Sequence, residues 1–425
     1  MTSRRPRLAV VISLFTHEST FIARELEELH RLGVEMVVYS LRRPSPADRR
    51  WFAAHLPRAT LRVPAYLLSL EVAAAGLRAL CMRPAILARL LGGILRDAAG
   101  SPPVLLRTLA VVPKSLAIGF DLERRRIDRV HAHWATVAAS SAWMAAAVAR
   151  RPFSFTAHAW DIMFDACLHR RKLQAAEFTV TCNAFGREEL LARQGAEFAP
   201  KVHLLYHGLD LSAYAPPAAG ERQAGLIVAV GRLTEQKGFH VLIEACGRLR
   251  DRGIPFVCRI AGGGGDCSER VRRAIAAHRL EGQVFLLGFL EPDEVVPLYR
   301  RATVVASPTV IARHGETDGL PNVVIEAMAC GTPVVGSSAA GLPEAIVHGE
   351  NGWLVPPGDA EALAQGLETV LRDRALQERL GDAARRTALA RFDVRRNTEQ
   401  LRALLFGAGA SVPGVSLPAS VSGRG

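Results

Sequence analysis

The sequence is short of cysteines and of long uncharged apolar runs. Its seven cysteines are scattered over 425 residues without a Cys-x-x-Cys pair, which is typical of reduced thiols in a cytoplasm and not of a disulfide framework. No window of about 18 uncharged apolar residues occurs, so the sequence predicts no transmembrane helix. Arginines precede the apolar stretch 8–15 as in a signal peptide, but no small-residue cleavage site follows, and we interpret the stretch as a buried strand.

Aromatic residues are also few, at 6%, although the formal net charge is +12. A basic balance of this size fits nucleic acid, acidic lipid or a phosphate-bearing ligand. Because the sequence has no basic–aromatic motif, we predict no nucleic-acid partner and favour peripheral contact with an anionic membrane surface. The sequence also lacks an Asp-x-Asp pair and a Gly-x-Gly-x-x-Gly fingerprint. It therefore indicates no metal site and argues against a dinucleotide-dependent oxidoreductase.

What the sequence does contain is an alternation of strand and helix patterns. LAVVISLF, an amphipathic helix and VEMVVYSL follow one another over 8–41, which predicts a right-handed parallel unit. The pattern restarts with LIVAVGRL at 226–233. The predicted fold class is α/β, with two doubly wound Rossmann-like domains facing a central cleft.

Changes in composition divide the chain. Residues 211–225 are rich in Ala, Pro and Gly without apolar periodicity, and we expect a linker there between domains at 1–210 and 226–405. Residues 61–120 predict a helical insertion, which is either a basic amphipathic surface on a membrane or a packed insertion with a solvated basic face. Residues 406–425 are expected to be disordered.

The stretch DGLPNVVIEAMACGTPVV (318–335) carries two acids around a predicted helix start. Pro321 suits the first helical turn, because its missing N–H would be unpaired there anyway. The N–H groups at this positively polarised end suit a phosphate; they belong to Leu320, Asn322 and Val323. Glu326 can bind both hydroxyls of a ribose, and Asp318 can reach hydroxyls beyond the phosphates. The alternative is a plain helix cap at Asp318 and a surface role for Glu326.

A second constellation lies in GRLTEQKGF, which places Arg232 and Lys237 in a loop after a predicted strand. Loops at this edge of a parallel sheet line the ligand crevice. Two cations there would neutralise a diphosphate. The neighbouring Gly231 and Gly238 favour close approach of a ligand over a merely solvated basic loop.

These blocks, with AGGGGD, LLGFL, LYRRATVVASP and GLPEAIVHGENGWLVPPGD, resemble the family-4 (group 1) retaining glycosyltransferases of the glycosyltransferase-B fold. In the first half, ESTFIARELEELHRLGVEMVVYSLRRP, HAHW and PFSFTAHAWDI resemble the exopolysaccharide branch of that family, the colanic-acid and amylovoran type. The resemblance extends to about residue 405. It implies an acceptor-binding first domain and a second domain that binds the nucleotide-sugar donor.

The resemblance implies roles for matching residues. Arg232 and Lys237 would bind the donor diphosphate and stabilise the leaving group, while Glu326 would bind the ribose. Asp318 stands where the family usually has Glu, and His158 matches an active-site histidine near the transferred sugar. His158, Asp318, Arg232 and Lys237 are thus the candidate catalytic residues. Further donor contacts are expected from Gly231, Gly262, Gly263, Phe289, Leu290, Gly319, Leu320, Pro321, Asn322 and Val323.

The acceptor side is less defined by the motifs. The loop FTHEST lacks the usual Gly-Gly pair, and Glu18 is placed there as an acceptor contact, beside His133 and Asp161. His131 and His133 point to the same side of their strand, but no third ligand is apparent in the sequence. We therefore expect a structural or acceptor-side role for HAHW and no metal.

The resemblance implies retaining, metal-independent transfer of a hexose from a nucleotide-diphosphate sugar, without a cofactor. The implied acceptor is a saccharide linked to polyprenyl diphosphate, in exopolysaccharide biosynthesis at the cytoplasmic face of the plasma membrane. The alternatives are a nucleotide-sugar epimerase or phosphorylase of the same fold and a non-catalytic assembly protein. Intact Arg232, Lys237 and Glu326 argue against the last.

Overall fold

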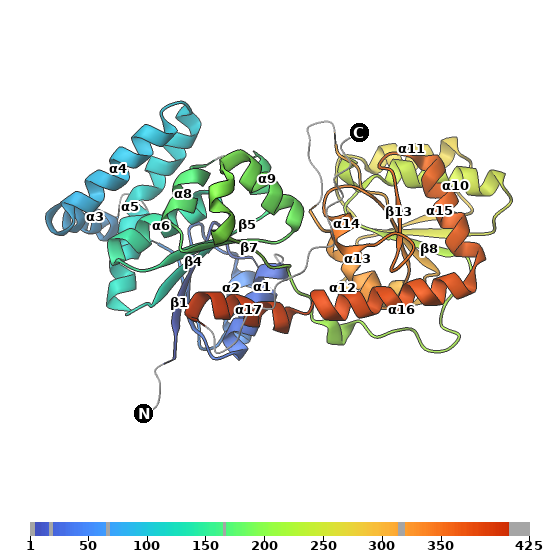
Figure 1. The fold of residues 1–425 in the computed structure, drawn as a ribbon, viewed down its shortest axis with the longest axis horizontal. Helices are drawn as coiled ribbons and strands as arrows, with labels where there is room; N and C mark the ends of the chain where they lie inside the picture. Colours follow the sequence, from blue (N-terminus) through green and yellow to red (C-terminus); the bar gives the residue numbers. More distant parts are fainter. Residues whose placement is uncertain (1–4, 17–19, 65–68, 165–166, 313–318, 408–425) are drawn as a thin grey trace. The chain divides into compact units, whose positions relative to one another are not determined.

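The computed structural model describes residues 5–16, 20–64, 69–164, 167–312 and 319–407. They form two compact units, each built on a parallel sheet with helices packed against it (Figure 1). The first unit takes the chain as far as Cys182, then Gly186–His207, then the chain from Arg395 onward. The second unit takes Asn183–Phe185 and Gly208–Val394. The predicted fold class of two doubly wound halves is confirmed.

The first sheet has seven strands in the order β3-β2-β1-β4-β5-β6-β7, all parallel. Its strand order reverses between β1 and β4, which is the switch point where such sheets bind ligands. The strands are β1 (Arg7–Ile12), β2 (Glu35–Ser40), β3 (Thr60–Arg62), β4 (Arg129–His133), β5 (Phe153–Ala157), β6 (Phe178–Thr181) and β7 (Val202–Leu204).

The helices of the first unit lie between its strands in the sequence and after the last of them. They are α1 (Thr20–Arg31), α2 (Pro46–His55), α3 (Leu70–Met82), α4 (Pro84–Ala98), α5 (Pro102–Arg124), α6 (Val137–Ala149), α7 (Ala159–Phe164), α8 (His169–Ala175), α9 (Ala184–Gln194), the 3-10 helix η1 (Ala196–Lys201) and α17 (Val394–Phe406). The start of α9 is assigned to the second unit.

The second sheet has six parallel strands in the order β10-β9-β8-β11-β12-β13. It reverses between β8 and β11. The strands are β8 (Leu226–Val230), β9 (Val257–Ala261), β10 (Val284–Gly288), β11 (Val304–Ser307), β12 (Val334–Ser337) and β13 (Trp353–Val355). The helices are η2 (Leu211–Ala213), η3 (Glu235–Lys237), α10 (Phe239–Asp251), α11 (Ser268–Ala277), α12 (Pro292–Arg301), α13 (Asn322–Ala329), α14 (Leu342–Ala345), α15 (Ala360–Arg372) and α16 (Arg374–Arg391).

The domain boundaries differ from those expected from composition. The stretch 211–225 belongs to the second unit, whereas the chain from Arg395 belongs to the first. Leu401 and Leu405 of α17 are buried in the same apolar cluster as Leu8 of β1. The composition could not reveal that the chain returns to the first unit at Arg395, because α17 has the same amphipathic pattern as the helices before it. The expected disordered tail lies outside the described residues, apart from Phe406 and Gly407.

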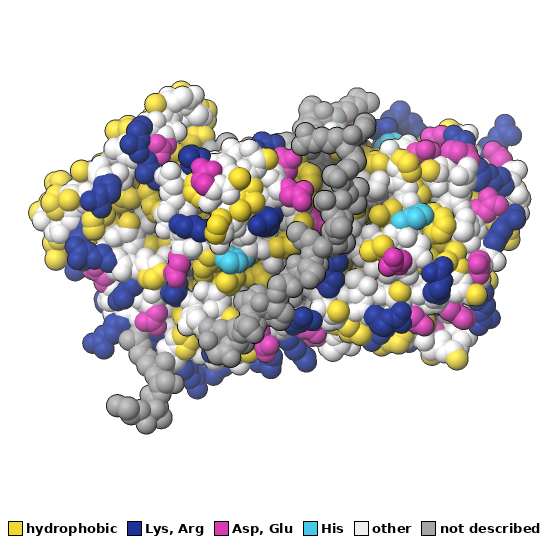
Figure 2. Space-filling view, viewed as in Figure 1, with side chains coloured by type: hydrophobic (Ala, Val, Ile, Leu, Met, Phe, Trp, Pro, Cys, Tyr) yellow, Lys and Arg dark blue, Asp and Glu magenta, His cyan; other side chains and the backbone are white. Residues whose placement is uncertain are grey.

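The segment at 61–120 is largely helical, as predicted, in α3, α4 and α5. Helix α5 contains Pro113 and continues to Arg124. It is long and apolar enough to cross a membrane by length and composition, but 44% of its most apolar window is buried inside the protein. A core helix passes the same test, so this is weak evidence. Figure 2 shows hydrophobic side chains gathered over α3 and α4 on the face in view.

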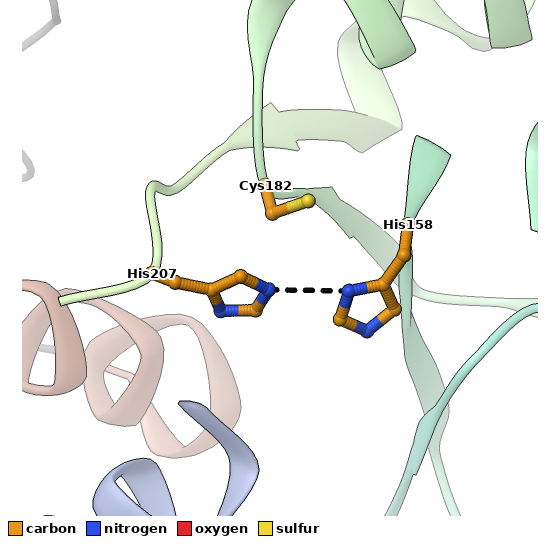
Figure 3. Close-up of side chains that lie close together, drawn as sticks. All are labelled: His158, Cys182 and His207. Atoms are coloured by element: carbon orange, nitrogen blue, oxygen red, sulfur yellow. Dashed lines mark hydrogen bonds between the residues drawn. The ribbon is translucent and has the colours of Figure 1, made fainter. Parts of the chain in front are cut away.

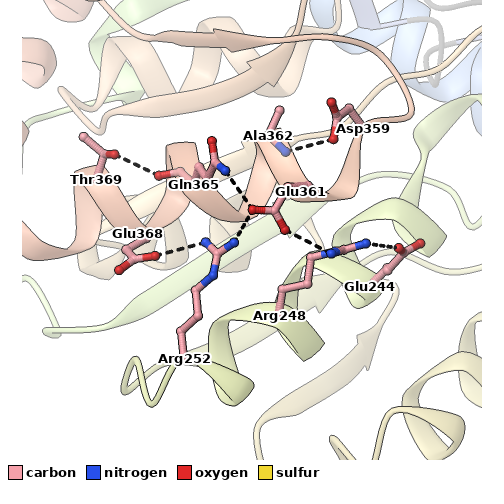
Figure 4. A network of polar contacts seen from close by, with 9 residues as sticks. All are labelled: Glu244, Arg248, Arg252, Asp359, Glu361, Ala362, Gln365, Glu368 and Thr369. Carbon is pink, nitrogen blue, oxygen red and sulfur yellow. Dashed lines mark hydrogen bonds and ion pairs between the residues drawn. The ribbon is translucent and has the colours of Figure 1, made fainter.

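A network of charged side chains joins α10 to α15 on the surface of the second unit (Figure 4). Glu361 of α15 accepts a hydrogen bond from Arg248 at 3.0 Å and another from Arg252 of the loop after α10. Arg252 also donates to Glu368 at 3.1 Å. Because these side chains lie at the surface and remain partly exposed, we expect the network to fix helix orientation more than to add stability.

The contact between α5 and α6 depends on one glycine. A Cβ atom at Gly119 would lie 2.7 Å from Cβ of Val148, whereas a Cβ at Gly92 of α4 would meet nothing within 4 Å. Gly119→Ala should lower the free energy of unfolding of the first unit by about 1–3 kcal/mol through overpacking. Gly92→Ala, the matched control, should raise it by roughly 0.5–1 kcal/mol by favouring the helix. Urea denaturation measures both; equal stability of the two variants would contradict the close packing.

Candidate active site

In the second unit, the loops that follow β8, β9 and β10 are hydrogen-bonded to one another. Gly231 donates its N–H to Ala261 O at 2.9 Å, and Gly262 donates to Gly288 O at 2.7 Å. The loops after β8 and β11 flank the point where the strand order reverses. Ligands of open α/β sheets bind at such points, so this edge is the candidate donor site.

Steric crowding explains why glycines occupy these loop positions. A Cβ at Gly262 would lie 1.9 Å from Gly231 O, and one at Gly238 would lie 1.8 Å from Pro308 O, both at positive φ. A Cβ at Gly263 would lie 3.3 Å from the side chain of Phe289. The requirement for glycine therefore comes from loop packing. The expected contacts of Gly231, Gly262 and Gly263 with a donor remain predictions.

The two predicted cations lie in the loop after β8. The side chain of Arg232 is exposed, and Lys237 is half-buried at the end of η3. A Cβ at Gly231 would lie 3.2 Å from Cδ and Cε of Lys237, so the lysine stem runs directly over this glycine. The position of Lys237 is thus set by the helical turn η3 and by Gly231, which has no side chain to obstruct the lysine stem. Phe289 and Leu290 follow β10, and Phe289 is 72% exposed.

The acidic stretch forms the loop and helix predicted for it, with a shift of one residue. Pro321 has ψ 127° and is the N-cap of α13, so it precedes the first turn and does not occupy it. Around it, Gly319, Leu320, Asn322 and Val323 are half-buried. Asp318 lies outside the described residues.

Glu326 has a partner that the sequence did not reveal. Tyr299 at the end of α12 donates its hydroxyl to Glu326 Oε2 at 3.0 Å. Tyr299 is completely buried, and burial together with the charge of Glu326 raises its pKa well above the usual value. The phenol therefore stays protonated and orients the carboxylate. The tyrosine lies in the motif LYRRATVVASP, but nothing in the sequence linked it to the helix of Glu326.

In the first unit, Asp161 holds the loops after β4 and β5 together. Its carboxylate accepts from the N–H of His158 at 2.6 Å and from the N–H of Ala135. Burial raises the pKa of Asp161 to about 7, opposed by these two donors. The side chain is fully buried. Asp161 is therefore placed to position His158, and the expected direct contact with an acceptor would require the buried carboxylate to become accessible. Lys172, also fully buried, donates to Ala135 O.

His158 lies in a cluster of rings, and Figure 3 shows His207 beside it. His158 Nδ1 and His207 Nε2 are 3.1 Å apart. The indole of Trp134 covers His158 at 4.2 Å between centroids, and Phe21 lies 4.4 Å from His207. Burial, followed by the charges of His207 and the other histidines, lowers the pKa of His158 well below its usual value. His158 is therefore a neutral imidazole at neutral pH.

The HAHW motif forms a second buried group. His133 Nε2 lies 3.1 Å from Glu25 Oε1 of α1, whereas His131 is hydrogen-bonded through both ring nitrogens, to Ser154 and Thr156. Burial alone would raise the pKa of Glu25, but the charge and hydrogen bond of His133, together with the charges of His131 and His207, outweigh burial and lower the pKa. The sequence pointed to no third member of this group, and the structure places Glu25 there. Glu18 lies outside the described residues.

Trp134 carries a further sign of a functional site. It directly follows β4 with φ 74°, in the left-handed region that bulky residues rarely adopt. Such conformations cost about 1–3 kcal/mol and cluster at binding and active sites. The strain lies next to His158, which supports the assignment of this edge as a functional surface.

The family model of glycosyl transferases group 1 matches residues 219–387, which lie in the second unit. Over these residues the chain is similar to the group 1 glycosyl transferases. WcaL of Escherichia coli, assigned to colanic acid biosynthesis, is 39% identical over 168 residues, covering 39% of this chain and 41% of WcaL. The amylovoran biosynthesis glycosyltransferase AmsK of Erwinia amylovora is 44% identical over 138 residues, covering 32% of this chain and 34% of AmsK. The alignments thus span about two fifths or less of these relatives. The resemblance to this family is confirmed.

Solved structures show the fold of the whole chain. HepE of Anabaena, crystallised with UDP, superposes with a TM-score of 0.68 at 19% identity, covering 94% of this chain and 98% of HepE. A glycosyltransferase of Rickettsia africae gives a TM-score of 0.69 at 18% identity, covering 96% of this chain and 100% of that chain. This confirms the glycosyltransferase-B fold.

The buried histidines predict a loss of stability in acid. Burial lowers the pKa of His131 and His169 to about 3 and that of His207 to about 4. Between these values and 6.5, the unfolded chain binds protons that the folded chain does not, so stability present above pH 6.5 is lost as pH falls. The cost is of order 1–2 kcal/mol per histidine at pH 5. Because the pKa of Asp161 is raised in the folded state, protonation of Asp161 stabilises the folded protein as the pH falls over the same range. This gain offsets the loss from about one histidine.

The measurement is the urea midpoint at pH 7, 6 and 5, which should fall with pH. His169→Gln should flatten this dependence, and the exposed His55→Gln serves as the matched control. A midpoint that rises on acidification would show that these imidazoles are not buried in the neutral form.

Proposed function

We propose that the protein is a retaining, metal-independent glycosyltransferase that moves a hexose from a nucleotide-diphosphate sugar to a saccharide acceptor in exopolysaccharide biosynthesis. One observation carries the proposal. At the switch point of the second unit, the loop of Arg232 and Lys237 and the helix of Glu326 flank the same edge of the sheet. This unit is also the part that the family model matches.

Breaking the bond between sugar and phosphate develops negative charge on the nucleotide. Arg232, Lys237 and the N-terminus of α13 supply positive charge where the diphosphate would lie. Glu326, oriented by the Tyr299 hydroxyl, would hold the ribose hydroxyls. The site thus stabilises the leaving group without requiring a metal ion.

By the resemblance to the family, His158 would contact the transferred sugar. Because it is neutral, it adds no positive charge beside a sugar that itself becomes positive in the transition state. Its ring is held by Trp134 and its backbone by Asp161, so it can present a hydrogen bond in a fixed direction. In the front-face route that retains configuration, the leaving phosphate oxygen accepts the proton of the acceptor hydroxyl as the new glycosidic bond forms.

The comparisons suggest which donors to test first. HepE has been crystallised with UDP and with UDP-glucose. Uridine nucleotide sugars are therefore the first candidates, with guanosine and adenosine nucleotides beside them.

The acceptor is proposed to be linked to polyprenyl diphosphate at the cytoplasmic membrane face. The support is the outer surface of α3, α4 and α5, where large apolar side chains are exposed: Leu70, Leu77, Leu80, Met82, Leu95 and Leu106. Exposed arginines accompany them, namely Arg78, Arg89, Arg96 and Arg107. Apolar side chains interspersed with arginine are typical of helices that lie on anionic lipid.

Donor binding is tested by thermal shift with a panel of UDP-, GDP- and ADP-sugars in the presence of EDTA. One nucleotide should stabilise the wild type, and Lys237→Ala and Glu326→Ala should each weaken it at least tenfold, about 1.4 kcal/mol. Arg374→Ala, on the exposed surface of α16, is the matched control and should bind normally. No shift with any nucleotide would favour a non-catalytic assembly protein, and nucleotide-sugar turnover without an acceptor would favour an epimerase.

Membrane contact is tested by flotation with liposomes that contain or lack anionic phospholipid. The wild type should float with the anionic liposomes. Leu77→Glu with Leu80→Glu should abolish this, because both leucines lie on the exposed side of α3. Leu389→Glu places the same charge at an exposed leucine of α16 and should leave flotation unchanged. Binding that does not depend on anionic lipid would refute the proposed contact.

A further inference from the structure

Three neighbouring strands of the first sheet each deliver a potential metal ligand to the same edge. His158 directly follows β5, Cys182 directly follows β6, and His207 comes shortly after β7. These strands pair in parallel, β5 with β6 and β6 with β7. Their carboxyl ends therefore lie side by side, and Figure 3 shows the three side chains converging.

The distances suit a small coordination sphere. One ligand atom from each side chain lies within 4.8 Å of the other two. His158 Nδ1 and His207 Nε2 are 3.1 Å apart. Two imidazole nitrogens bound tetrahedrally to one zinc ion at about 2.0–2.1 Å would be roughly 3.3 Å apart. The two rings are thus close to the spacing they would have as joint ligands.

The donor set indicates the kind of ion. Two imidazoles and a thiolate favour zinc and related borderline ions over magnesium or calcium, which prefer oxygen ligands. Three protein ligands leave a fourth position for water, as in zinc sites that remain open. Cys182 forms no disulfide.

A second group of potential ligands in the first unit is less suited to hold an ion than His158, Cys182 and His207. Glu25, His131 and His133 are also close enough together to hold an ion. However, both nitrogens of His131 are engaged by Ser154 and Thr156, at 2.8 and 3.0 Å. In the group of His158, His158 Nδ1 and His207 Nε2 face each other across one hydrogen bond, and an ion placed between them would replace that bond.

The surroundings favour a defined site. The ring of Trp134 packs against His158 at a tilt of 30°, and Phe21 contacts both His158 and His207. These apolar walls limit the water available to compete for the ion. Cys182 and His207 are partly exposed, whereas His158 is buried, so an ion would enter past Cys182 and His207.

We propose that His158, Cys182 and His207 form a binding site for zinc or a similar ion, and that its occupation inhibits the enzyme. On binding, the Cys182 thiol releases its proton to solvent and its sulfur bonds to the ion. The N–H shared between the two histidines moves to the other nitrogen of its ring, which frees both facing lone pairs. The inhibitory role rests on the proposed function, because the ion would withdraw His158 from the sugar.

Cobalt(II) titration of the untagged full-length protein tests the site directly. One equivalent should produce a thiolate-to-cobalt absorption band in the near ultraviolet, and zinc should abolish it. Cys182→Ser and His207→Ala should each weaken cobalt binding at least tenfold. Cys81→Ser, an exposed cysteine outside the group, is the matched control and should retain the band. A wild type without the band, or a band that persists in Cys182→Ser, would overturn the site.

A second measurement uses only the wild-type protein, so it does not depend on the folding of a variant. Zinc should protect Cys182 in the wild type from iodoacetamide, as read from the mass of its peptide, and EDTA should restore alkylation. Equal alkylation with and without zinc would overturn the proposal.

Enzyme assays then separate the two claims. Zinc should inhibit glycosyl transfer by the wild type, with an inhibition constant at least tenfold lower than for Cys182→Ser. Equal inhibition of both proteins would refute the inhibitory role. Cobalt binding without any glycosyl transfer would leave the site established and count against the proposed function instead.

Discussion

The parallel alignment of strands is the constraint on which the rest of this protein depends. A strand cannot pair in parallel with its successor unless the chain crosses back over the sheet, and every crossover starts from the same edge. In each unit this collects short loops from distant parts of the sequence at one edge. His158, Cys182 and His207 meet in this way in the first unit, as do the loops around Gly231 and Gly262 in the second.

The two edges are suited to different tasks. In the second unit the edge carries exposed and half-buried cations together with the start of α13, which suits an anionic ligand. In the first unit the edge carries the neutral, buried imidazole of His158 between aromatic rings. A neutral, sterically defined surface discriminates by shape and hydrogen bonding, whereas a charged one attracts a whole class of ligands. The difference follows first from residue type, because Arg and Lys are charged at neutral pH whereas imidazole is largely neutral, and burial favours the neutral imidazole further.

Local patterns sufficed to predict the fold class, the loop of Lys237 and the helix that carries Glu326, because strand period, glycine and proline act over a few residues. They could not reveal Tyr299 beside Glu326, or Asp161 as a buried anchor, because those contacts join elements distant in sequence. Pro321 was misplaced by one residue, since proline fits both the cap and the first turn. The sequence did not predict the cluster of His158, Cys182 and His207 for a similar reason. Its three members are separated along the chain and meet only because β5, β6 and β7 are neighbours in the sheet.

Helix α17 makes the first unit discontinuous in the sequence. Because Leu401 and Leu405 lie in the core of the first unit and Asn397 donates to Tyr206 O at 3.0 Å, that unit is made from both ends of the described chain. The second unit is therefore an insertion within the first. A fragment that stops at residue 207 would expose the apolar surface that α17 covers, whereas joining 207 to 395 with a short linker would keep the core whole. During synthesis, the first unit cannot complete its core until the entire second unit has left the ribosome.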